Sequence, residues 1–233
     1  MFSAAATPRG QSGITNTQRN NVISLGTDQV KRLLCLGAHS DDIEIGCGAT
    51  IRKLTQTHPG LTVWWVVFTA DGKRRTEARK SAEDFLQDAG KSRVIIKQFR
   101  NGYFPFEGAA IKDFFESLKS RFEPDLVFTH FREDRHQDHR VISDLTWNTF
   151  RNHFILEYEI PKYDGDLASP NFFMPINEKL AEEKARNLCR YFQTQSNKHW
   201  FDRDTFLALM RLRGMECCAK YAEAFYARKT VCV

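Results

Sequence analysis

Two short segments concentrate the side chains that could carry chemistry, His39-Ser40-Asp41-Asp42 and His136-Gln137-Asp138-His139. A catalytic zinc ion takes three protein ligands and keeps a fourth position open, and two histidines with one carboxylate are an established ligand set. His39, Asp42 and His139 supply such a set. A structural zinc would need four ligands, usually with cysteine, and no cysteine accompanies either segment. The pattern therefore predicts a catalytic metal site.

The remaining side chains of the two segments suit the chemistry around such a metal. Asp41 is free to act as a general base, and His136 remains as a second acid–base group. Asp138 can accept a hydrogen bond from an imidazole and fix its tautomer. Taken singly, an aspartate pair after a strand is often only a helix cap, and a histidine pair in a charged loop usually lies on the surface. The occurrence of both segments in equivalent places favours catalysis.

Both segments follow short apolar runs that are typical of strands buried on both faces. Apolar runs of this kind alternate along the chain with stretches of helical periodicity. This alternation predicts βαβ units and hence a Rossmann-like, three-layer α/β fold with a mostly parallel sheet. Loops at the carboxyl ends of parallel strands meet in one crevice, so the two segments are expected to share one site there. The predicted strands are 31–37, 61–70, 94–99, 126–130 and 154–160.

The pattern loosens towards the C-terminus. We expect a loop over 161–176, followed by helices over 178–193 and 203–228. No repeat or low-complexity linker divides the chain. The polar N-terminal residues predict a flexible arm over 1–27, and the remainder, 28–233, is expected to form a single domain.

Composition narrows the setting in which the protein works. The formal net charge is +5, an excess that a solvated surface accounts for, and neither a basic stripe nor a nucleic-acid-binding motif is present. We therefore expect no nucleic-acid partner. No apolar run is long enough to span a membrane and no signal-peptide pattern is found. The six cysteines contain no C-x-x-C pair, which favours reduced cysteines and a cytoplasmic location.

Two stretches of sequence resemble a known family. LLCLGAHSDDIEIGCGATI is similar to the first signature of the PIG-L/LmbE-like N-acetylglucosaminyl deacetylases, in which His-Pro-Asp-Asp follows the first strand. PDLVFTHFREDRHQDHR is similar to the second, with its His-x-Asp-His run. The similarity extends to Arg74, Glu77 and Ala222–Phe225, and so spans most of 31–228. Ser40 stands where the family usually has proline.

The resemblance implies a zinc-dependent hydrolase that removes an N-acetyl group from a small-molecule amino sugar or sugar nucleotide in a bacterial cytoplasm. It implies that His39, Asp42 and His139 bind zinc, with Fe²⁺ left open as the metal. It also implies that Asp41 is the general base. His136 would stabilise the oxyanion or protonate the leaving amine, with Asp138 orienting it. The sugar and the oligomeric state, including a homo-oligomer, stay open.

Three alternatives compete with this function. Another amide, in an acylated natural product or a thiol-sugar conjugate, would use the same machinery. A non-haem iron oxygenase shares the two-histidine, one-carboxylate ligand set, but it would leave Asp41 and His136 without roles. A non-catalytic sugar-binding relative would be expected to have lost one of these residues, and all are present.

Three basic residues follow the second predicted strand and should reach the same crevice. Lys73, Arg74 and Arg75 could clamp an anionic substrate group, with Arg74 as the best candidate for substrate binding. They could equally form a solvated loop in which Arg74 pairs with Glu77 one helical turn on.

Two other patterns near the predicted site have simpler explanations. Gly46-x-Gly48 lacks the third glycine of a dinucleotide-binding loop and follows an acidic turn, so we expect it to allow close packing of a helix on the sheet. Aromatic side chains of the loop after the third strand, at Tyr103, Phe104 and Phe106, could line the substrate site.

Overall fold

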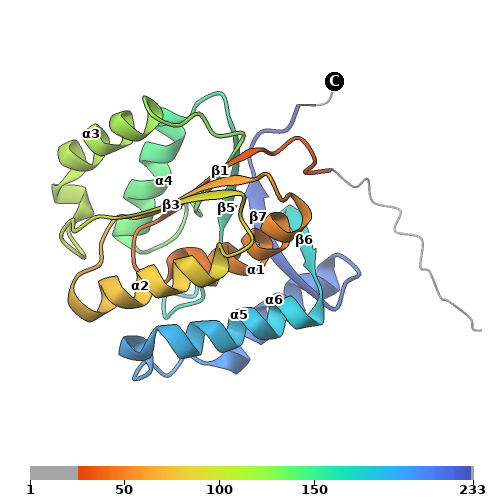
Figure 1. The fold of residues 1–233 in the computed structure, drawn as a ribbon. Coiled ribbons are helices and arrows are strands. Elements are labelled where there is room, and N and C mark those ends of the chain that lie inside the picture. The colour runs from red at the N-terminus through yellow and green to blue at the C-terminus, as the bar shows by residue number, and fades with distance from the viewer. Residues whose placement is uncertain (1–25, 232–233) are drawn as a thin grey trace, which may run out of the picture.

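A computed structural model describes residues 26–231, and the arm predicted for 1–27 lies almost wholly outside them. The described chain is built on a seven-stranded sheet with strand order β3-β2-β1-β4-β5-β7-β6 (Figure 1). The strands are β1 Arg32–Gly37, β2 Thr62–Val67, β3 Lys91–Ile96, β4 Leu126–His130, β5 Phe154–Tyr158, β6 Phe172–Ile176 and β7 Tyr221–Ala227. The helices are α1 Asp42–Thr57, α2 Gly72–Phe85, α3 Gly108–Lys119, α4 Gln137–Thr149, α5 Glu178–Tyr191 and α6 Arg203–Glu216, with 3-10 turns η1 Phe104–Phe106 and η2 Gln193–Gln195.

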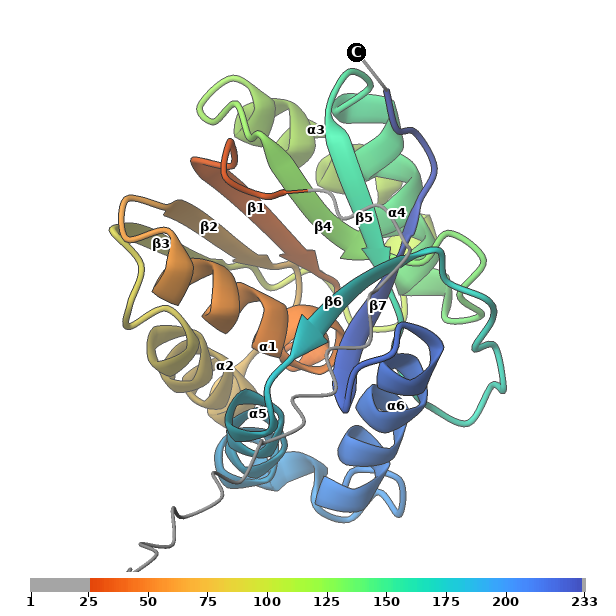
Figure 2. The ribbon, with the colours of Figure 1, turned by 90° about the vertical axis from the view of Figure 1, so that its right-hand side faces the viewer.

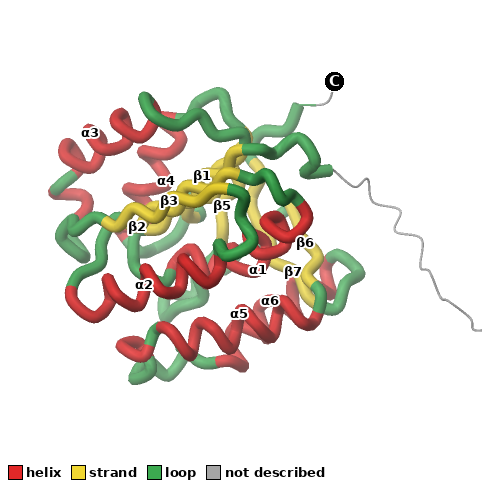
Figure 3. The backbone as a smooth tube through the Cα atoms, viewed as in Figure 1, coloured by secondary structure: helices red, strands yellow, loops and turns green. Residues whose placement is uncertain are grey.

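The sheet lies between two helical layers. Helices α3 and α4 cover one face, while α1 and α2 cover the other, with α5 beyond them and α6 beside β6 and β7 (Figure 3). Strands β1 to β5 pair in parallel, and their alternate side chains enter two separate cores. In β1, Leu33 and Cys35 face the α1 side and Leu34 and Leu36 face the α3 side. Because both faces are buried, these strands need continuous apolar sequence. The prediction of a mostly parallel three-layer sheet is confirmed.

The topology brings the two chemical segments together. Strands β1 and β4 are neighbours in the sheet although β2 and β3 separate them in the sequence (Figure 2). From β1 the chain passes into α1 on one face, and from β4 it passes into α4 on the other. The crevice between these diverging connections is where open α/β sheets bind ligands.

The C-terminal prediction was wrong in two places. Strand β6 occupies part of the expected loop, and the expected helix over 203–228 ends at Glu216 and gives way to β7. The reversal needs Cys218 at a positive φ of 57°. It also needs Gly214, where a Cβ atom would lie 2.7 Å from the Lys220 backbone. Strand β7 then enters antiparallel between β5 and β6. Pairing with these strands overrides the helical spacing of the local sequence.

Helix α1 is interrupted at Cys47, whose φ and ψ of −146° and 16° are not helical. The backbone N–H groups of Ala49 and Thr50 donate instead to the buried carboxylate of Glu223, at 3.1 and 2.6 Å. Lys184 forms an ion pair with this carboxylate and donates to a carbonyl in the turn before the break. Residues of α5 and β7 therefore satisfy the polar groups that the interruption exposes.

Gly46 allows close packing of α1 on the sheet, as predicted, whereas Gly48 allows close packing on a helix. A Cβ atom at Gly46 would lie 2.1 Å from the Tyr158 ring of β5, and one at Gly48 would lie 2.8 Å from the Phe85 ring of α2. One glycine therefore faces the sheet and the other faces a helix. No helix within residues 26–231 is both long and apolar enough to cross a membrane.

Candidate metal centre and active site

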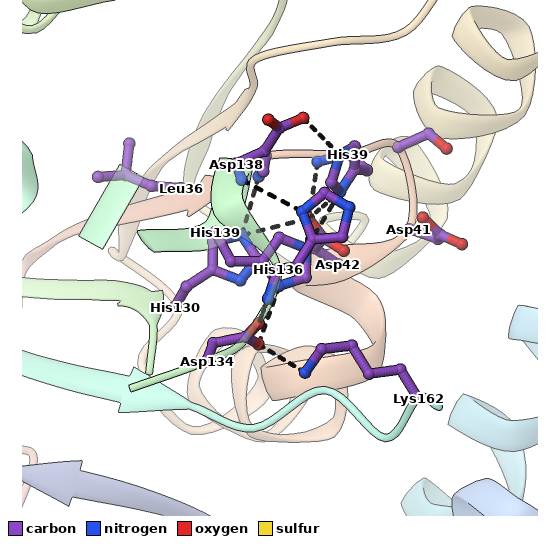
Figure 4. Close-up of polar contacts among 12 residues, drawn as sticks. Leu36, His39, Asp41, Asp42, His130, Asp134, His136, Asp138, His139 and Lys162 are labelled. Carbon is purple, nitrogen blue, oxygen red and sulfur yellow. Dashed lines mark hydrogen bonds and ion pairs between the residues drawn. The ribbon is translucent and has the colours of Figure 1, made fainter. Parts of the chain in front are cut away.

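Three predicted ligand atoms converge at the carboxyl ends of β1 and β4 (Figure 4). His39 Nδ1 lies 3.1 Å from His139 Nε2 and 3.3 Å from Asp42 Oδ2, and the last two atoms are 3.5 Å apart. Ligands at ordinary zinc distances in a tetrahedral site are separated by about 3.4 Å. The three side chains therefore fit one zinc-sized ion.

The fold explains why these atoms meet. His39 lies in the turn that leaves β1, and Asp42 is the first residue of α1. The Asp42 carboxylate accepts a hydrogen bond from the His39 backbone N–H at 2.6 Å, which fixes the turn. His139 is in the first turn of α4. All three side chains are buried, so their geometry is set by packing on the sheet.

A carboxylate orients each candidate histidine ligand through its other ring nitrogen. Asp138 Oδ2 lies 3.2 Å from His39 Nε2, and Asp134 Oδ2 lies 2.9 Å from His139 Nδ1. In a metal site, such pairing fixes the tautomer and leaves the lone pair of the other ring nitrogen available to the ion. The backbone N–H groups of Gly102 and Phe104 donate to Asp138 at 2.7 and 3.1 Å, and so hold its carboxylate in place.

The structure corrects the role predicted for Asp138. The sequence predicts that it orients His136, but its carboxylate contacts His39 instead. Only the Asp138 backbone N–H reaches His136, donating to Nδ1 at 3.2 Å.

The sequence-based prediction missed two residues beside the centre. Asp134 lies in the charged loop before α4. It is one of several acidic residues there, and nothing in the sequence distinguishes it from the others. His130 ends β4, is fully buried, and stacks on His139 with ring centroids 3.9 Å apart. Its Nε2 accepts a hydrogen bond from the Ala38 backbone N–H at 2.9 Å. The sequence could have indicated His130, because it is a histidine at the end of a predicted strand and lies close to the His136–His139 segment.

Replacing Asp134 by asparagine should weaken zinc binding by about 10- to 100-fold, because the charged acceptor that orients His139 is lost. Zinc affinity measured by competition with a chelator tests this. Asp166→Asn is the matched control, because Asp166 also forms an ion pair with Lys162, whereas Asp134 is the one of the two that contacts His139. Equal zinc affinity in Asp134→Asn and the wild type would remove the orienting role.

Electrostatics favour exchange of a proton for a cation at this centre. Burial opposes the charged form of His39, but the Asp42 and Asp138 carboxylates outweigh it and raise the pKa of His39 to about 9. Burial, reinforced by His130, lowers the pKa of His139 to about 3. Of the three candidate ligands, His39 is therefore the one that would have to lose a proton for a metal ion to bind near neutral pH.

Asp41 points towards the same space from the turn before α1. Burial and the adjacent Asp42 carboxylate raise the pKa of Asp41. Arg74 Nη2 donates to Asp41 Oδ1 at 3.3 Å, and Arg74 Nε donates to Ser40 Oγ at 3.0 Å. Ser40 thus provides an acceptor that a proline at this position would lack.

The predicted pairing of Arg74 with Glu77 does not occur. The Glu77 carboxylate binds the backbone and hydroxyl of Thr194 instead. Lys73 is exposed, and Arg75 donates to the Ile96 carbonyl. Of the three basic residues after β2, only Arg74 lines the crevice.

His136 is held as a hydrogen-bond donor. Burial, together with the charge of His39, lowers the pKa of His136, which favours the neutral form of its ring. Its Nδ1 accepts the Asp138 backbone hydrogen bond, which places the proton on Nε2.

These residues surround a pocket of about 210 Å³. The aromatic residues predicted to line the substrate site, Tyr103, Phe104 and Phe106, do not line this pocket. Phe104 is fully buried and Phe106 is 80% exposed. The lining residues are His39, Asp41, Asp42, Ile45, Arg74, Asn101, His136, His139, Ile160, Lys162, Tyr163, Asp164, Lys198 and Trp200.

Solved structures place the architecture among deacetylase-like folds. The structure superposes on the N,N'-diacetylchitobiose deacetylase from Pyrococcus horikoshii with a TM-score of 0.65 and 24% identity, over 84% of this chain and 83% of that one. It superposes on GalB, the 4-carboxy-2-hydroxymuconate hydratase from Pseudomonas putida, with a TM-score of 0.68 and 16% identity, over 87% and 98% of the two chains. At such identities these similarities establish the fold alone, and the reaction has to be argued from the site.

Sequence comparison identifies the family. Residues 34–150 match PIG-L, described as GlcNAc-PI de-N-acetylase. The chain is also 30% identical over 141 residues to the uncharacterised deacetylase YaiS of Escherichia coli, across 56% of this chain and 75% of that protein. The chain belongs to the PIG-L family of deacetylases.

Proposed function

We propose that this protein is a zinc-dependent deacetylase that removes an N-acetyl group from an amino sugar. The observation that carries the proposal is the convergence of His39, Asp42 and His139 on one zinc-sized position, with Asp41 beside it. In this proposal the three converging residues are the metal ligands. Fe²⁺ is the alternative metal for the same ligands.

Bound zinc would polarise the acetamide carbonyl and acidify a water molecule. Asp41 accepts the proton of the attacking water, a role that suits a carboxylate whose pKa is raised. His136 donates from Nε2 to the carbonyl oxygen as negative charge develops on it.

The structure supports one source for the proton that the leaving amine requires. The pKa of His136 is lowered, which favours its neutral form, so in this proposal His136 serves as a hydrogen-bond donor. Asp41 carries the proton taken from water and can pass it to the departing nitrogen. Acetate and a free amino sugar are the products.

The substrate class rests on the relatives. The PIG-L family is named for the removal of an N-acetyl group from GlcNAc-PI, and the Pyrococcus horikoshii enzyme is named for N,N'-diacetylchitobiose. Both names refer to N-acetylated amino sugars. A different acylated amide remains the alternative within the same chemistry. A bacterial cytoplasmic location, the single domain over 28–233, homo-oligomerisation and the lack of a nucleic-acid partner stay predictions from the sequence.

Acetate release from a panel of N-acetylated sugars tests the proposal. The panel contains N-acetylglucosamine, diacetylchitobiose, N-acetylglucosamine phosphates and UDP-N-acetylglucosamine, each with metal-stripped, zinc-loaded and iron(II)-loaded protein. We expect release from at least one sugar with metal and almost none without. Release that is independent of metal would contradict the mechanism. Zinc-loaded protein that is inactive on every sugar would favour another amide.

A further inference from the structure

One part of the pocket is built by residues beyond the family match. Lys198 and Trp200 follow the 3-10 turn η2, and Tyr163 lies in the loop after β5. The Trp200 and Tyr163 rings are perpendicular, with centroids 6.4 Å apart. Lys198 Nζ lies 5.5 Å from the centroid of the Trp200 ring. This wall therefore combines aromatic surface with a positive charge.

Of the cations in the pocket, two retain donors that are not already used. Lys162 is 8% exposed and is neutralised by Asp134 and Asp166. Arg74 uses Nε and Nη2 for Ser40 and Asp41, which leaves Nη1 without a partner among residues 26–231. Lys198 Nζ likewise has no hydrogen bond or ion pair within the part of the chain that the structure describes.

These two cations line the same pocket as Asp41. The charges of Arg74 and Lys198 both act on Asp41, the residue proposed to activate water. The exposed carboxylate of Asp164 also lines the pocket. Its negative charge would repel a bound anion. A partly desolvated guanidinium and ammonium with unused donors suit phosphate or carboxylate oxygens.

We infer that the amino sugar bound here carries a phosphate or carboxylate group, held by Lys198 together with Arg74. This inference rests on the proposed deacetylase function and adds the chemical class of its substrate. Ser40 supports the arrangement because its hydroxyl accepts from Arg74 Nε and so positions the free end of the guanidinium. The Trp200 ring offers an apolar face to the sugar.

Binding of reaction products to zinc-loaded protein tests the inference without turnover. The probes are glucosamine, glucosamine 1-phosphate, glucosamine 6-phosphate and muramic acid, with Kd measured by calorimetry. We expect at least one anionic probe to bind about tenfold more tightly than glucosamine. The phosphate and carboxylate probes identify which group is preferred. Equal Kd values for all four probes would overturn the inference.

Substitutions distinguish binding of the anion by Lys198 from direct binding of the anion to zinc. Lys198→Met should remove most of the preference and leave the Kd of glucosamine unchanged. Asp164→Asn should strengthen anion binding by removing a like charge. Lys179→Met is the matched control on an 82% exposed side chain and should preserve the preference. A preference that survives Lys198→Met would assign it to Arg74 or to zinc and overturn the role of Lys198.

Failure of this inference can be told apart from failure of the deacetylase proposal. Acetate release from neutral sugars with no preference for anions would overturn the inference alone. Anion binding that depends on Lys198, in a protein that releases no acetate from any panel member, would support the pocket and contradict the reaction.

Discussion

Asp41→Asn is expected to bind zinc as the wild type does and to lose about 10²- to 10⁴-fold in kcat. Asparagine fits the same space and can still accept a hydrogen bond from Arg74, but it cannot take a proton from water. The paired measurements are the zinc content of the purified variant and the rate of acetate release from the best substrate of the panel.

Each outcome for Asp41 has a distinct meaning. Asp113→Asn, at an exposed position of α3, is the control for the substitution itself and should retain full activity. A fully active Asp41→Asn protein would place the general base elsewhere. Loss of zinc from the variant would indicate that Asp41 is itself a metal ligand. We do not expect this, because Asp41 is not among the three side chains whose ligand atoms converge.

Gly46→Ala is expected to lower the free energy of unfolding by about 3 kcal/mol, at the severe end for overpacking. The added methyl group would lie 2.1 Å from the Tyr158 ring. That ring cannot easily move, because it is fully buried and its hydroxyl donates to the Leu36 carbonyl at 2.6 Å. Helix α1 would have to lift from the sheet. Urea denaturation followed by circular dichroism measures the loss.

A second glycine provides the control for this effect. Gly108 begins α3, and a Cβ atom there would meet no heavy atom within 4 Å. Gly108→Ala should therefore change the free energy of unfolding by less than about 1 kcal/mol, with the sign set by helix propensity. Equal stability of the Gly46→Ala and wild-type proteins would show that the helix has room to adjust.

The parallel half of the fold could be predicted because burial on both faces leaves a strong local signal. Continuous apolar runs such as Leu126–His130 match strands of the structure at both ends. Strands β6 and β7 gave no such signal, because their existence depends on pairing with β5 and with each other. The turn before β7 requires a positive φ at Cys218. A cysteine in the sequence does not predict this conformation, because residues other than glycine rarely adopt it.

The meeting of His39, Asp42 and His139 could be predicted because it follows from strand direction and strand order alone. The carboxylates that orient the two histidines, Asp138 and Asp134, could not be predicted from the sequence. Whether Asp138 faces His39 or His136 depends on loop backbone, namely the N–H groups that hold its carboxylate. Lys198 reaches the pocket through the packing of η2, a contact that no local pattern encodes.

The break in α1 ties the candidate site to a segment that lies beyond the matched family region. The family match ends at residue 150, yet Glu223 and Lys184 complete the backbone hydrogen bonding of the helix that begins with Asp42. A chimera that takes its C-terminal segment from a relative must therefore bring equivalent partners with it. Glu223 and Lys184 are thus the anchors through which the C-terminal segment supports the helix that begins with Asp42.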